Sequence, residues 1–68
     1  MNEEVLNTSL RKFLKTVGVT SQREIEMAIR EAVAAGRIKG NEALKARMVL
    51  TVDAVGLDHT IDSTIELE

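Results

Sequence analysis

The spacing of apolar residues changes once along this chain, near residue 43, and that change limits the folds open to it. Before this point apolar side chains recur every three or four residues, which is the spacing of an amphipathic helix. From Leu44 onward they alternate with polar side chains, which is typical of a strand with one covered face. The sequence therefore predicts a single α+β domain over residues 1–68, with helices first and an antiparallel β-hairpin after them.

The first predicted helix covers residues 2 to 17. Asn2 suits the N-cap position, and the acidic residues that follow it suit the positive end of a helix dipole. We expect Gly18 to end this helix, because glycine readily adopts the left-handed conformation that follows many helices. The covered stripe would consist of Leu6, Leu10, Phe13, Leu14 and Val17.

A second helix is predicted over residues 22 to 35. Ser21 and Glu24 have the spacing of a capping box, in which each side chain bonds the other residue's backbone N–H. Gly36 would end this helix. Its covered stripe would consist of Ile25, Ala28, Ile29, Ala32 and Val33, and we expect both helices to lie on one face of the hairpin.

Two strands are predicted, over residues 44–53 and 60–67, with a connection over residues 54–59. The favoured register places Asp53 opposite Thr60, because apolar side chains then face one another on the covered side. On the other side, this register pairs Arg47 with Glu66 and Lys45 with Glu68. A short third strand over Arg37–Lys39 is a further expectation. The covered face would hold Leu44, Ala46, Met48, Leu50, Val52, Ile61, Ser63, Ile65 and Leu67.

Composition excludes several classes of function. The 68 residues contain no cysteine, one histidine and one aromatic residue, Phe13. Disulfides, thiolate zinc sites and base-stacking platforms therefore lack the residues they need. The net charge of −2 gives no electrostatic attraction to nucleic acid or to an anionic membrane. The acidic start and the lack of a long apolar run predict a cytoplasmic protein with no membrane association.

Three segments carry a resemblance to known proteins: Thr20–Glu26, Ala32–Ile38 and Val55–Ile61. Together they resemble short bacterial proteins of about this length that are grouped as a family of unknown function. The similarity covers most of the chain from Val17 to Glu66. It implies a bacterial, cytoplasmic setting and brings no activity with it.

A second resemblance is to winged-helix DNA-binding domains, in which a helix end like Ala35-Gly36-Arg37-Ile38 precedes a β-hairpin wing. Here the wing would be Arg47–Leu67. This resemblance implies a nucleic-acid interface, and the basic residues available to it are Arg37, Lys39, Lys45 and Arg47. The chain departs from the winged-helix pattern, because that pattern needs three helices and the sequence predicts two.

His59, beside Asp58 and near Asp53 and Asp62, is the one group that suggests chemistry. Carboxylates and an imidazole can bind a divalent cation or transfer protons. The same residue types are also common in turns, and a hairpin tip offers no cavity, so we favour an ordinary turn. Nucleophile motifs and phosphate-binding glycine loops are missing. We therefore expect no enzyme activity, no cofactor and no metal.

Some apolar residues lie outside the predicted covered faces. They are Met27 on the second helix, Val49 on the outer face of the first strand, and Val55 and Leu57 in the connection. A two-stranded sheet is marginal alone and has open edges, so these residues favour association. The sequence thus predicts a non-enzymatic interaction or self-assembly module of unknown function. Its partner would be itself, as a homodimer or small oligomer, or another protein; the alternative is a winged-helix-like nucleic-acid binder.

Overall fold

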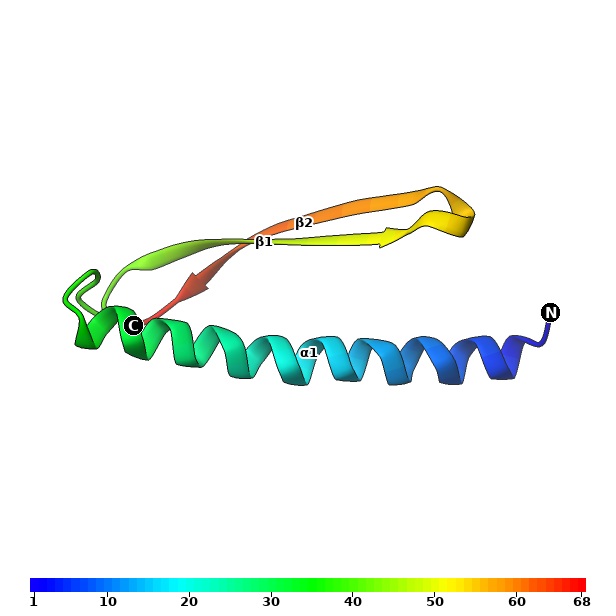
Figure 1. The fold of residues 1–68 in the computed structure, drawn as a ribbon, viewed down its shortest axis with the longest axis horizontal. Coiled ribbons are helices and arrows are strands. Elements are labelled where there is room, and N and C mark those ends of the chain that lie inside the picture. The colour runs from blue at the N-terminus through cyan, green and yellow to red at the C-terminus, as the bar shows by residue number, and fades with distance from the viewer. The chain divides into compact units, whose positions relative to one another are not determined.

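The computed structural model describes residues 1–68 and contains one long helix followed by an antiparallel β-hairpin (Figure 1). The elements in chain order are α1 (Glu3–Ala34), β1 (Ala43–Val52), the short 3₁₀ helix η1 (Asp53–Val55) and β2 (Leu57–Glu66). The chain divides into two units, Met1–Arg37 with the helix and Ile38–Glu68 with the hairpin. The predicted α+β class and the antiparallel hairpin are confirmed.

The prediction of two helices is wrong, because α1 continues without a break through residues 18 to 21 (Figure 1). Gly18 does not adopt the left-handed conformation of a helix stop; positive φ angles occur only at Gly36, Gly40 and Gly56. Ser21 lies inside the helix, so it does not cap a new one. Thr16 and Thr20 also lie there, and their hydroxyls donate to the carbonyls of Lys12 and Thr16 at 3.1 and 2.7 Å.

The free energies involved explain why the helix continues. A glycine inside a helix costs about 1 kcal/mol relative to alanine. A break would leave the last four carbonyls of one helix and the first four N–H groups of the next without intrahelical partners. The capping box could satisfy only part of this loss, at about 1 kcal/mol for a good N-cap. No proline is present to force a break.

Both outer ends of α1 form as the sequence predicts. The Asn2 side chain accepts from the backbone N–H groups of Glu4 and Val5 at 3.0 and 3.2 Å. At the other end Gly36 has a φ of 76° and its N–H donates to the carbonyl of Val33. The N–H of Arg37 donates to the carbonyl of Ala32 at 2.9 Å, which completes a Schellman motif.

The hairpin has two strands of ten residues each, and the predicted third strand at Arg37–Lys39 is wrong because the sheet holds β1 and β2 only. β1 is one residue earlier than predicted at each end. β2 begins at Leu57, three residues earlier than predicted, since the connection is shorter. That connection is η1 closed by Gly56, whose φ of 67° is left-handed and whose N–H donates to the carbonyl of Asp53 at 3.1 Å.

The predicted register is also wrong. Val52 lies opposite Leu57, not Ile61, so β2 is displaced by four residues from the predicted pairing. Because the displacement is an even number, every side chain remains on its predicted face. The observed pairs on the covered side include Leu44 with Ile65 and Met48 with Ile61. On the other side Arg47 lies opposite Asp62, so its predicted pairing with Glu66 is not formed.

Along α1, charged and polar residues interrupt the apolar ones throughout, and no stretch of it is apolar enough to cross a membrane.

Candidate interaction surfaces

Neither unit has an interior of its own. No side chain in the structure is buried. Sixteen large apolar side chains expose more than a third of their surface, although hydrophobic residues make up 44% of the chain. Most soluble monomers leave apolar residues exposed singly, and larger groups of them mark interaction sites. These exposed side chains are therefore the candidate functional surface.

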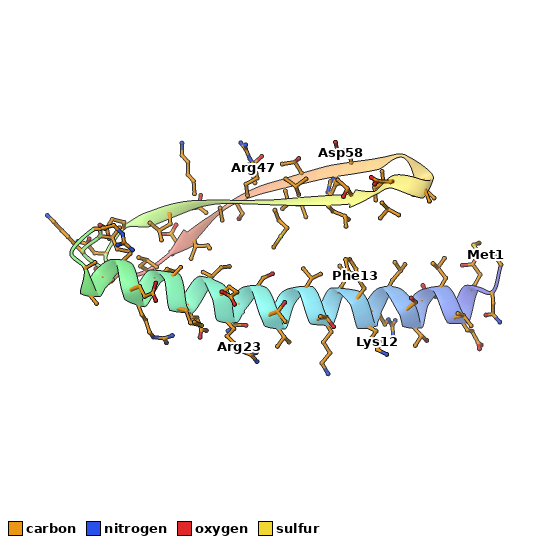
Figure 2. The ribbon with its side chains drawn as sticks, viewed as in Figure 1. Met1, Lys12, Phe13, Arg23, Arg47 and Asp58 are labelled. Atoms are coloured by element: carbon orange, nitrogen blue, oxygen red, sulfur yellow. The ribbon has the colours of Figure 1, made fainter.

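On α1 the apolar side chains form a stripe in each half of the helix. Spacings of three and four residues group the members of each half, an eight-residue interval from Val17 to Ile25 separates the two halves, and Phe13 and Lys12 project from different sides (Figure 2). The first half is the bulkier, because the second half contains two alanines. The members of the first half are Leu6, Leu10, Phe13, Leu14 and Val17, and those of the second half are Ile25, Ala28, Ile29, Ala32 and Val33. We call this set the α1 stripe.

On the hairpin the two faces differ in chemistry. The face that holds Leu44 and Met48 is apolar, apart from Ser63 and His59. The opposite face, from which Arg47 and Asp58 project (Figure 2), is charged and polar. Val49 is the one large apolar residue on this charged face, and 57% of its surface is exposed.

The four predicted interface residues lie on different parts of the fold and are all exposed. Met27 is on α1, outside the α1 stripe, and 52% of it is exposed. Val49 is in the middle of β1. Val55 is in η1 at the hairpin tip, and Leu57 is the first residue of β2, opposite Val52. Leu57 thus belongs to the apolar face of the hairpin and not to a loop.

The four predicted nucleic-acid residues do not form a free basic surface. Arg47 donates from Nε to Asp62 Oδ1 at 2.9 Å. Lys45 lies opposite Thr64, so its predicted pairing with Glu68 is not formed. Arg37 directly follows the end of α1, and Lys39 lies in the segment before β1. The unit that would serve as a wing contains three basic and six acidic residues, and the chain supplies one helix where the winged-helix pattern needs three.

The structure separates the residues around His59. His59 is in β2 opposite Leu50, on the apolar face, whereas Asp58 and Asp62 are on the charged face. Asp53 is in η1. The predicted turn at Asp58 and His59 is wrong, because both residues are in β2. No group of three or more potential metal ligands occurs.

Glu42 has a role that the sequence analysis missed. Its carboxylate accepts from the backbone N–H groups of Lys39, Gly40 and Asn41 at 2.8, 2.9 and 3.1 Å. The bond from Lys39, followed by that from Gly40, lowers the pKa of the Glu42 carboxyl below its usual value. A glutamate directly after Gly40-Asn41 was the available signal. This arrangement fixes the segment that leads into β1.

The surface hollows are open to solvent. One is lined by Glu4, Val5, Thr8, Ser9 and Lys12, all on α1, and another by residues of β1 and β2 alone. One helix or one flat ribbon cannot enclose a ligand, whereas small-molecule sites bury most of the ligand surface.

Together the fold and these surfaces define a small α+β protein made of one helix and one hairpin, neither of which has a core of its own. The chain belongs to a family that is described as a family of unknown function (DUF6494), and the match covers residues 1–68. The resemblance to a short family of unknown function is thus confirmed. Neither the curated proteins nor the solved structures contain a match to the chain.

Proposed function

We propose that this protein is a non-enzymatic self-assembly module whose fold is completed by a second copy of the same chain. The observation that carries this proposal is that neither the helix nor the hairpin buries an apolar side chain by itself. A domain below about 70–80 residues rarely stabilises itself by its own core, and oligomerisation is one of the usual remedies. Disulfides are not available here, since the chain has no cysteine.

α1 is longer than either strand of the hairpin. α1 has 32 residues and is therefore about 48 Å long. Each strand has ten residues and is about 33 Å long. Apolar side chains extend over most of the helix length, and Met27 lies outside the α1 stripe. Another chain is a source of cover for them.

The asymmetry of α1 favours a second copy in antiparallel orientation. Antiparallel pairing would place the bulky half of the α1 stripe against the half that contains Ala28 and Ala32, so that large side chains meet small ones. The two halves also differ in net charge. The first half has three basic and two acidic residues, a net charge of +1, and the second has two basic and three acidic residues, a net charge of −1. Parallel pairing would bring halves of like net charge together.

Met27, Val49, Val55 and Leu57 are part of the proposed contact surface, because each is exposed in the single chain. A bacterial cytoplasmic setting is also part of the proposal, supported by the resemblance of residues 17–66 to short bacterial proteins.

Sedimentation equilibrium at several protein concentrations tests the proposal. We expect a mass that rises above the 7.5 kDa of one chain. It should persist at high salt, because apolar contacts are not screened, and should not change when duplex DNA is added. A constant mass of 7.5 kDa at every concentration would contradict self-assembly.

Phe13→Glu should weaken the assembly at least tenfold, since burial of a large apolar side chain contributes about 1.5–3 kcal/mol. Met27→Glu should weaken it less, because Met27 is outside the α1 stripe. Thr8→Glu is the matched control, since it adds the same charge at an exposed polar position of α1. Equal dissociation constants for Phe13→Glu and Thr8→Glu would exclude the α1 stripe as a contact.

A further inference from the structure

The backbone of β1 has a free edge whose hydrogen-bonding groups can be assigned. The N–H of Leu67 donates to the carbonyl of Glu42 at 3.3 Å, so these two residues form a hydrogen-bonded pair. In an antiparallel ladder such pairs recur at every second residue. The even-numbered residues of β1 therefore bond to β2. The N–H and C=O groups of Lys45, Arg47, Val49 and Thr51 point away from β2.

The outer edge of β2 differs from that of β1. By the same alternation, the residues of β2 that point outward are Asp58, Thr60, Asp62, Thr64 and Glu66. Three carboxylates along this edge would repel the same edge of another copy. β1 instead contains five consecutive uncharged residues, Met48 to Val52, without glycine or proline. Uncharged β-prone segments at an open edge are the ones that pair with further strands.

We propose that β1 pairs with β1 of a second copy, antiparallel across a two-fold axis at Val49, to form a four-stranded sheet in the order β2-β1-β1-β2. This inference rests on the proposed self-assembly and identifies one of its contact surfaces. The pairing gives the exposed Val49 an apolar neighbour, the partner's Val49. It also satisfies the free N–H and C=O groups at the centre of the edge.

The side chains on both faces agree with this register. On the apolar face, Met48 would lie opposite the partner's Leu50 and Ala46 opposite the partner's Val52. On the charged face, Arg47 would lie opposite the partner's Thr51, so no like charges meet there. A shift that centred the axis on Arg47 would bring two guanidinium groups together.

A proline substitution tests the edge without removing a bond of the hairpin. The Val49 N–H points away from β2, so Val49→Pro removes a donor only from the free edge. Thr60→Pro is the matched control, since Thr60 lies opposite Val49 and its N–H points outward from β2. We expect Val49→Pro to weaken the assembly at least tenfold in sedimentation, and Thr60→Pro to leave it unchanged.

Because the natural chain lacks cysteine, single cysteine variants give a second readout that does not depend on the tolerance of proline. Two Val49→Cys chains would have Cα atoms about 5.5 Å apart in a hydrogen-bonded pair, within the range of a disulfide. We expect Val49→Cys to form a disulfide-linked dimer under mild oxidation much faster than Thr60→Cys.

The outcomes separate this inference from the proposed function. If the unsubstituted protein assembles, but Val49→Pro keeps its mass and both cysteine variants oxidise at the same rate, the β1 edge is not a contact and self-assembly stands. If the unsubstituted protein remains at 7.5 kDa, both proposals fail.

Discussion

At the scale of single residues, Glu42 shows how one side chain organises the start of the hairpin. Three successive backbone N–H groups donate to its carboxylate, and these bonds favour the ionised form. Because the pKa of this carboxyl is lowered in the folded chain, the bonds stabilise the fold at pH values above its ordinary pKa of 4.5. Their contribution is lost as the pH falls through the lower pKa of the folded state.

The direction of this pKa shift can be measured by titration. In NMR spectra recorded from neutral to acidic pH, the amide protons of Lys39, Gly40 and Asn41 should shift together, with a common midpoint below 4.5. Glu42→Gln removes the ionisable group and should abolish the common midpoint. Three unrelated midpoints, or a common one above 4.5, would show that the amides do not bond this carboxylate.

Gly56 is the residue that decides where β2 begins. Its φ of 67° is unfavourable for a residue with a Cβ atom, although no atom lies within 4 Å of the place where that Cβ would be. Gly56→Ala should therefore reduce the free energy of unfolding through backbone strain alone, by about 1–2 kcal/mol. Urea denaturation measures this change, and an unchanged stability would contradict the left-handed conformation.

At the scale of elements, the outer ends of α1 could be predicted and its middle could not. Asn2 and Gly36 act as caps because they provide hydrogen bonds to backbone groups at the helix ends that have no partner within the helix. Gly18 and the Ser21–Glu24 pair carry equally good local signals. Such sequence signals do not account for the backbone hydrogen bonds that a break would remove. In α1 the free energy of these bonds outweighs that of the caps.

Gly18→Ala distinguishes one helix from two. In a continuous helix the new methyl group meets no atom within 4 Å and raises helix stability by about 1 kcal/mol. At a left-handed helix stop the same substitution would destabilise the chain, as at Gly56. Thermal unfolding followed by circular dichroism should show a higher midpoint for Gly18→Ala, and a lower midpoint would favour two helices.

The hairpin shows the same division between what is and is not predictable. Alternation in the sequence assigns each side chain to a face, and these assignments are correct. Any even displacement of β2 preserves the faces, so alternation cannot select the register. The pairing of Arg47 with Glu66 and of Lys45 with Glu68 was weak support, because exposed ion pairs contribute little. The left-handed Gly56 fixes the register instead.

At the scale of the whole molecule, the exposed apolar side chains carry the proposed function. The positions of Met27, Val49 and Val55 outside the covered faces were predictable, because each breaks the pattern of its own element. Leu57 was assigned to a connection, since the shorter turn was not foreseen. The proposed pairing between chains could not be inferred from one chain's periodicity; we inferred it from the open edge of β1 and the two unlike halves of α1.

The dependence of thermal stability on protein concentration tests most directly whether a second copy completes the fold. Association that is coupled to folding raises the unfolding midpoint as the concentration rises, by mass action. We predict that the midpoint, measured by circular dichroism from micromolar to millimolar protein, increases steadily with the logarithm of the concentration. A midpoint that is the same at every concentration would mean that one chain folds alone, and would contradict the account.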